Sequence, residues 1–321
     1  MRRSWTYRLV KYSVAAAAYI YIAHRIYHSD FSGGSGFLHS VYSPTGWLSL
    51  IGVFLLMFVN WGIEAVKWMV ALRGMVTLGF ISSLRSVWAG VVAGLLTPNR
   101  VGEPLGRVAE VPEGIRGRAA LLAAWCSVNQ LAATLAFGII GFAIIRTYPC
   151  LIPSVVVSPW VSLSVLALLL VAILFFVLRI QAISGYLSRV FARLGVTSNE
   201  GLMVSVPASI RVWVWVLSAT RYGVFAVQLF LLLRLVGVQG GTDTIFGAIF
   251  LTYLLATITP SFAISDPGVR ASFGVVIIGC ATGCDPTLVV LATFTLWVIN
   301  LALPAALYAS GMVGRWSYGL R

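Results

Sequence analysis

Long apolar runs separated by short polar links make up most of this chain. The runs approach the roughly 20 residues that a helix needs to cross a bilayer, whereas a transmembrane β-barrel shows alternating runs of about ten. The pattern therefore predicts an all-α, polytopic helical membrane protein. About six spanning helices are expected, near residues 8–24, 47–70, 118–145, 159–179, 211–235 and 287–312.

Two shorter apolar segments are interrupted by Pro and Gly. One covers 84–97 and continues near 104–111, and the other covers 244–259 and continues near 267–283. We expect each to be a broken or re-entrant helical element, one in each of two pseudo-repeated halves. Matching interruptions of this kind in a membrane protein point to a polar site near the bilayer midplane.

The two interruptions have nearly the same residue order. Positions 97–107 read TPNRVGEPLGR, and positions 259–270 read TPSFAISDPGVR. In each, an acid is followed by Pro, and an Arg stands four residues after the acid. An acid followed by Pro suits the N-cap and first turn of a helix, so new helices are expected to start at Glu103 and Asp266.

Composition excludes a soluble protein. Hydrophobic residues make up 60% of the chain and charged residues 10%, and the mean hydropathy is +0.95, which leaves too little polar surface to cover a globule. The formal net charge is +13, but the basic residues are dispersed between apolar runs. We therefore expect membrane lipids, anionic in charge, as partners and no nucleic acid, while protein partners stay unknown.

Basic residues also predict the orientation. Four of the first eleven residues are basic, which places the N-terminus in the cytoplasm by the positive-inside rule. Seven basic residues between 67 and 118 place both ends of the first broken element on that side. Continuing this path, the second element enters from outside and the C-terminus is cytoplasmic, so the two elements dip toward each other from opposite faces of a bacterial cytoplasmic (inner) membrane.

The whole chain, 1–321, is expected to form a single integral membrane domain. Its first half is 1–180 and its second half is 207–321. The segment 181–206 between them has apolar residues at helical spacing among polar ones, which predicts an amphipathic cytoplasmic link.

Signatures of cofactor and enzyme chemistry are largely absent from the sequence. Four Cys and three His form no metal-ligand pattern, and no nucleophile elbow, phosphate-binding loop or H-E-x-x-H motif is present. We therefore expect no metal and no cofactor, and the chain is more consistent with a non-enzyme.

Few charged residues fall inside the apolar helices, and those that do are candidates for function because burying a charge is costly. Glu64 and Lys67 stand three apart, and a local salt bridge that merely neutralises Lys67 is the ordinary explanation. Arg221 is a single embedded cation. It lines a lipid path, extends to the interface, or pairs with Glu64 or Asp266.

The interruptions carry the other candidates. If the helices after the breaks point their N-termini inward, their free N–H groups and the nearby Arg100, Arg107 and Arg270 create an anion pocket that suits a phosphate headgroup. Arg fits this role because its planar fork holds phosphate in two contacts and keeps its charge. The alternative is that Glu103 and Asp266 are plain helix caps, each with a structural ion pair to the Arg four residues on.

Three stretches resemble the lysylphosphatidylglycerol synthase transmembrane-region family, which is also described as a flippase-like membrane domain. They are PNRVGE at 98–103 with Arg107, the segment 260–270, and the EAVKW stretch that begins at Glu64. The likeness covers about residues 45–312. It implies a polytopic helical domain with re-entrant elements that binds, and in some members translocates, phospholipids or related anionic lipid carriers.

The chain departs from that family in two ways. In that family a soluble aminoacyl-transfer domain would follow the membrane region, and the sequence here stops at Arg321, so we do not expect lysyl transfer from tRNA. The second signature usually reads Gly-Gly-x-Gly-Val-Arg-Glu, but here Asp266 and Pro267 precede Gly268, and Ala271 stands where the acid would be. An altered cargo is one reading of this change, with Asp266 in place of the missing carboxylate.

Our leading hypothesis is a lipid transporter or flippase-like protein. Its substrate-binding residues would be Glu64, Arg100, Glu103, Arg107, Arg221, Asp266 and Arg270. Two alternatives stay open at this point: a membrane-embedded enzyme acting on lipid-linked substrates with Glu103 or Asp266 as base, and a non-catalytic envelope scaffold.

Overall fold

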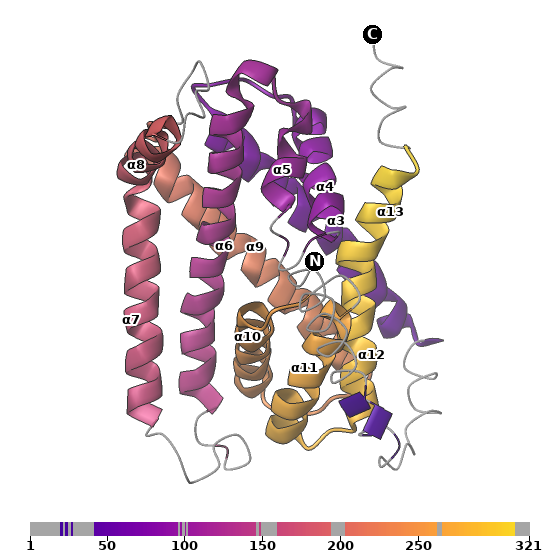
Figure 1. Cartoon of the computed structure of the whole chain (residues 1–321). Helices are drawn as coiled ribbons and strands as arrows, with labels where there is room; N and C mark the ends of the chain where they lie inside the picture. The colour runs from indigo at the N-terminus through magenta and orange to yellow at the C-terminus, as the bar shows by residue number, and fades with distance from the viewer. Residues whose placement is uncertain are drawn as a thin grey trace, which may run out of the picture. The chain divides into compact units, whose positions relative to one another are not determined.

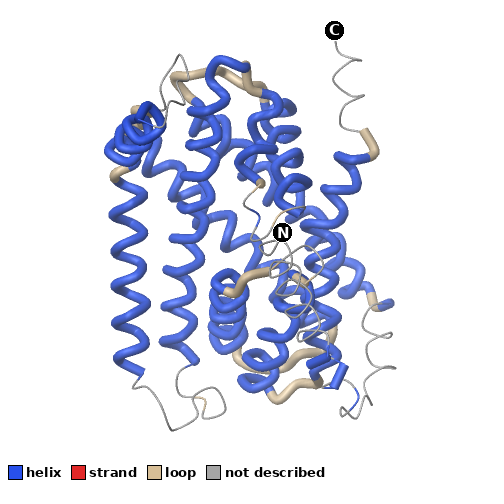
Figure 2. The backbone as a smooth tube through the Cα atoms, in the orientation of Figure 1, coloured by secondary structure: helices blue, strands red, loops and turns tan. Residues whose placement is uncertain are grey.

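In the computed structural model the described residues form helices joined by turns and loops, and no strand is present among them (Figure 2). It describes residues 20, 21, 23, 24, 27, 42–95, 97, 100, 102–145, 148, 159–193, 203–261 and 265–311. The helices, labelled in Figure 1, are α3 (Pro44–Leu72), α4 (Phe80–Leu95), α5 (Glu103–Arg107), α6 (Arg116–Ile145), α7 (Pro159–Leu178), α8 (Ile180–Arg193), α9 (Ala208–Leu235), α10 (Thr242–Ile258), α11 (Asp266–Thr282), α12 (Pro286–Trp297) and α13 (Leu303–Ala309).

Four stretches of helix are long and apolar enough to cross a membrane. A bent pair, Ala167–Phe175 with Ile180–Tyr186, would make a fifth. The chain is therefore an all-α helical membrane protein, as its hydropathy pattern predicts. The first of the six expected spans, 8–24, lies almost entirely outside the described residues. The four spans are Pro44–Leu72, Glu113–Ile145, Ala208–Leu235 and Pro286–Ala309.

Both broken elements have the predicted form of a short helix, an interruption and a further helix. α4 and α10 have 16 and 17 residues, which is short for a spanning helix. The helices after the interruptions differ, because α5 has 5 residues and α11 has 17. The predicted amphipathic link is helical over α8, and its residues 194–202 lie outside the described part of the chain.

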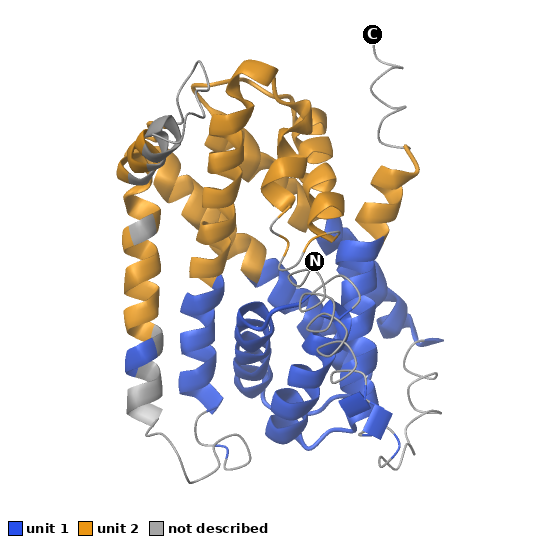
Figure 3. Ribbon diagram, in the orientation of Figure 1, with its two compact units in different colours: residues 1–58, 134–166, 223–302 blue, residues 59–133, 167–222, 303–321 orange. Residues whose placement is uncertain are grey.

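The described chain divides into two compact units (Figure 3). Unit 1 comprises residues 1–58, 134–166 and 223–302, and unit 2 comprises 59–133, 167–222 and 303–321. Each of the four spans contributes residues to both units, so the units interleave along the chain.

In unit 2, α5 folds back along α4 as an antiparallel hairpin. Gly102 and Gly106 of α5 face α4, where a Cβ on Gly106 would lie 2.5 Å from the Ala89 carbonyl oxygen. On α4, Gly90 and Gly94 face the residues 100–107 in reverse order. Two G-x-x-x-G pairs therefore line this contact, and the absence of side chains lets the two backbones approach closely.

In unit 1, α10 and α11 form a second hairpin. The start of α10 lies beside the end of α11, because a Cβ on Gly240 would be 3.4 Å from a methyl group of Thr282. α10 also packs on α6, where a Cβ on Gly141 of α6 would lie 2.6 Å from the carbonyl oxygen of Gly247 on α10. In both broken elements the second helix therefore runs back alongside the first.

The N-terminus of α12 depends on a side-chain cap. Asp285 is the N-cap, and its carboxylate accepts a hydrogen bond of 2.7 Å from the backbone N–H of Thr287. We expect Asp285→Ala to lower the free energy of unfolding by about 1 kcal/mol, because a helix N–H loses its acceptor. Thermal unfolding of the purified protein measures this, and Asp285→Asn, which keeps an acceptor, is expected to lose clearly less. Equal losses in the two variants would contradict the capping role.

Candidate functional site

Arg107, at the end of α5, is buried deep in unit 2 and is only 2% exposed. Its side chain crosses Gly90 of α4, where a Cβ would lie 2.6 Å from the Arg107 Cγ. One nitrogen, Nη2, donates both to Glu64 on α3 and, at 2.6 Å, to Glu103 on its own helix. The glycine on α4 therefore makes room for a guanidinium group inside the unit.

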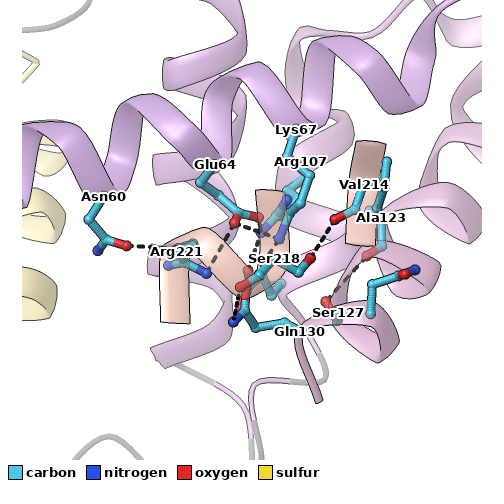
Figure 4. Close-up of polar contacts among 12 residues, drawn as sticks. Asn60, Glu64, Lys67, Arg107, Ala123, Ser127, Gln130, Val214, Ser218 and Arg221 are labelled. Carbon is cyan, nitrogen blue, oxygen red and sulfur yellow. Dashed lines mark hydrogen bonds and ion pairs between the residues drawn. The ribbon is translucent and has the colours of Figure 1, made fainter. Parts of the chain in front are cut away.

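Glu64 is the hub of the cluster around Arg107 (Figure 4). It is 1% exposed, and its carboxylate contacts three cationic side chains from three helices. Lys67 lies 2.7 Å away, and the guanidinium group of Arg221 on α9 lies 3.0 Å away. The predicted salt bridge to Lys67 is present, and the predicted pairing of Arg221 is with Glu64.

Glu103 extends this cluster toward the interruption between α4 and α5. Arg100 pairs with its other oxygen at 3.1 Å and is itself about one-third exposed. Burial raises the pKa of a carboxyl group, but Arg100 and Arg107 outweigh it and hold the pKa of Glu103 at about 2. Glu103 is therefore a charged partner of two arginines.

Arg100 also has an unusual backbone. Its φ angle is +59°, in the left-handed region that non-glycine residues seldom adopt. Such a conformation costs about 1–2 kcal/mol, and residues strained in this way cluster at functional sites.

Uncharged polar groups surround the ion pairs. Asn60 accepts a hydrogen bond of 3.0 Å from Arg221, whose guanidinium carbon lies 5.1 Å from the Trp61 ring centroid. Lys67 donates to Gln130 at 3.3 Å. Asn60 was not among the predicted site residues, although its spacing from Glu64 and Lys67 puts all three on one face of α3.

The ion-paired network, which we call the Glu64 cluster, holds four cationic side chains and two carboxylates. Two donor atoms of Arg107, Nε and Nη1, are buried without a hydrogen-bond partner. The indole N–H groups of Trp61, Trp68 and Trp88 in the same unit are also buried and unpartnered. This part of the described protein therefore has more buried donors and positive charge than its own acceptors satisfy.

The second interruption forms a separate cluster in unit 1. The Asp266 carboxylate accepts from Arg270 at 3.0 Å, from the Trp297 indole at 3.1 Å and from the Ser261 hydroxyl at 3.3 Å. Arg270 is 31% exposed, so it is far less enclosed than Arg107. The acid and Arg four residues apart thus form the same ion pair at both interruptions, as the structural alternative predicts.

The predicted capping role of these acids is wrong. The N-caps are Gly102 and Ser265, neither of which makes a side-chain capping bond, and Glu103 and Asp266 are the first residues of their helices. Their carboxylates contact the arginine side chains four residues on, because that spacing places the two side chains next to each other on the helix surface.

A scan against protein-family models gives no match for this chain, and a search of curated proteins gives none either.

Proposed function

We propose that the protein is a lipid transporter of the flippase-like kind, which binds the phosphate of an anionic lipid headgroup at the Glu64 cluster. The observation that carries this proposal is the buried Arg107, with two unpartnered donor atoms in a network where cations outnumber carboxylates. A buried excess of positive charge is costly unless an anion compensates it. A phosphate group supplies both the charge and several acceptor oxygens.

The membrane setting narrows the kind of anion. A cluster buried among apolar spanning helices is more readily reached by a lipid headgroup than by a large soluble anion. The resemblance of the two interruptions to the lysylphosphatidylglycerol synthase transmembrane-region family favours the same class of cargo. In this proposal Arg107 and Arg221 hold the headgroup, and Glu64 keeps the two guanidinium groups in position between transport cycles.

The orientation belongs to the proposal as well. Cys280, near the end of α11, is disulfide-bonded, and disulfides persist mainly outside the cytoplasm. This supports a location outside the cytoplasm for the end of the α10–α11 hairpin that carries Cys280. The proposed orientation is that of a bacterial inner-membrane protein with both termini in the cytoplasm.

The enzyme alternative finds less support in the geometry. Glu103 pairs with Arg100 and Arg107, and Asp266 pairs with Arg270, so both carboxylates already have cationic partners. A general base works best with a pKa near the operating pH, which the value of about 2 for Glu103 does not provide.

Reconstitution into vesicles tests the transport proposal. Transbilayer movement of fluorescent phosphatidylglycerol is followed by adding a reductant that destroys label only in the outer leaflet. We expect the wild-type protein to accelerate this movement over protein-free vesicles. Arg107→Lys is expected to lower the rate by about tenfold, because Lys keeps the charge but loses the planar fork that holds phosphate in two contacts.

The matched control is Arg116→Lys. Arg116 pairs with Glu113 at 3.1 Å on the surface of unit 2 and is 44% exposed, so its replacement is expected to leave the rate unchanged. Native mass spectrometry of copurified lipids separates binding from transport. A wild-type rate equal to that of empty vesicles, with no anionic lipid retained, would overturn the proposal, as would equal rates for Arg107→Lys and wild type.

A further inference from the structure

The described residues of unit 2 contain fewer carboxylates than the Glu64 cluster needs. Four acidic residues fall among them, which are Glu64, Glu103, Glu110 and Glu113. Glu110 pairs with Arg85 at 3.0 Å and Glu113 with Arg116 at 3.1 Å, so each of these two already has a cationic partner outside the cluster. The four cations of the cluster therefore share two carboxylates, and two positive charges are left over.

Two of the four cations lie with Glu103 along one face of α4. A Cβ on Gly90 would be 2.6 Å from the Cγ of Arg107, and a Cβ on Gly94, about one turn further on, would be 3.3 Å from the Cβ of Arg100. Both glycines also face Glu103, at 3.3 Å from its Cγ and 3.4 Å from its Cβ. The glycines thus let the two arginines and the acid pack directly against α4.

Glu103 joins the two arginines but leaves donors of both unused. Its two oxygens contact Nη2 of Arg107 at 2.6 Å and Nη2 of Arg100 at 3.1 Å. The Nε of Arg100, and the Nε and Nη1 of Arg107, are buried without a hydrogen-bond partner. Arg100 is 34% exposed and Arg107 is 2% exposed, so the pair has one end open to an incoming ligand and one enclosed end.

We infer that Arg100 and Arg107 together select a headgroup with two negative charges, a lipid phosphate monoester, over a phosphodiester. A phosphomonoester carries about two charges at pH 7 and three acceptor oxygens, which match the two left-over cations and their unused donors. A phosphodiester carries a single charge and leaves one cation uncompensated, which is costly in a buried cluster. The inference rests on the proposed function and names the class of lipid that the Glu64 cluster binds.

Native mass spectrometry of the purified protein tests this selection. Phosphatidic acid and phosphatidylglycerol with identical acyl chains are titrated at about pH 7.5, where a phosphomonoester is almost fully ionised. We expect phosphatidic acid to bind at least about tenfold more tightly, because it forms a further charge-assisted contact. Arg100→Gln is expected to reduce this ratio below about threefold, whereas the control Arg116→Gln, which removes a cation from the surface pair with Glu113, keeps the wild-type ratio.

Glycerol 3-phosphate, a soluble phosphomonoester, distinguishes a lipid headgroup from a free phosphate compound. We expect it to displace phosphatidic acid poorly, because it has no acyl chains to bury in the membrane. Displacement as effective as that by phosphatidic acid itself would leave the preference for two charges in place and would overturn lipid transport.

The outcomes separate this inference from the transport proposal. Wild-type protein that binds phosphatidylglycerol as tightly as phosphatidic acid overturns the selection even where phosphatidylglycerol is transported, and so does an unchanged ratio in Arg100→Gln. A tenfold ratio that Arg100→Gln abolishes supports it even where vesicle transport fails, and binding of neither lipid overturns both. Should Arg100→Gln not fold, Arg100→Gly takes its place, because glycine adopts a φ of +59° without strain.

Discussion

Replacing Glu64 with Gln is expected to destabilise the protein more than any other single change in the cluster. The substitution keeps the shape of the side chain but removes the charge that Lys67, Arg107 and Arg221 share. Removing one partner from a buried ion network costs about 3–5 kcal/mol, because the remaining charges stay buried without compensation. Thermal unfolding in detergent measures the loss, together with the yield of folded protein.

Glu113→Gln is the matched control for Glu64→Gln. Glu113 is 88% exposed and pairs with Arg116, and an ion pair on the surface contributes about 0–1 kcal/mol. A second variant, Glu64→Gln with Lys67→Met, is expected to recover part of the lost stability, since it removes one of the uncompensated cations. Similar stability of Glu64→Gln and Glu113→Gln would show that Glu64 does not balance the buried cations.

Gly106→Ala is expected to disrupt the α4–α5 hairpin. The new methyl group would lie 2.5 Å from the Ala89 carbonyl oxygen and 2.7 Å from the Gly90 Cα, both of which are backbone atoms that cannot rotate away. Overpacking of this kind costs about 1–3 kcal/mol, which exceeds the small gain in helix propensity from Ala. Because Arg107 is the next residue, the variant is also expected to lose phosphatidylglycerol transport. Melting temperature and vesicle assay measure the two effects.

Gly52→Ala provides the control for this steric argument. Gly52 lies within α3, and a Cβ there would meet no atom within 4 Å. Its replacement is expected to leave stability unchanged or slightly raised. If Gly106→Ala were as stable as Gly52→Ala, the close approach of the two backbones would not be a requirement of the fold.

The positions of the helices could be predicted from the sequence, because the length of an apolar run and the position of a Pro determine where a helix begins and ends without reference to distant residues. The run predicted at 211–235 is α9 at Ala208–Leu235, and the broken segment predicted at 244–259 is α10 at Thr242–Ile258. The helix after the first interruption was harder to predict. α5 ends at Arg107, where a 3₁₀ turn replaces it, and the adjacent glycine, Gly106, lies inside α5 and so does not mark its end.

The sequence predicted which charged residues belong to the site better than it predicted which of them contact each other. A charge in an apolar helix identified Glu64 and Arg221, but their contact joins residues far apart in the chain, and no local pattern selects it over pairing with Asp266. The sequence also did not predict that the hydroxyls of Ser83 and Ser86 on α4 are buried without a hydrogen-bond partner, because small residues in a helix predict close packing equally well.

The backbone of Arg100 has a consequence for how the chain can change over evolution. Glycine adopts a φ near +59° at no steric cost, yet this position carries a long cation. At position 100, stability favours glycine, whereas a positive charge at the tip of the α4–α5 hairpin requires the arginine. Selection for stability alone would therefore replace Arg100 with glycine, and selection for the charge would retain it.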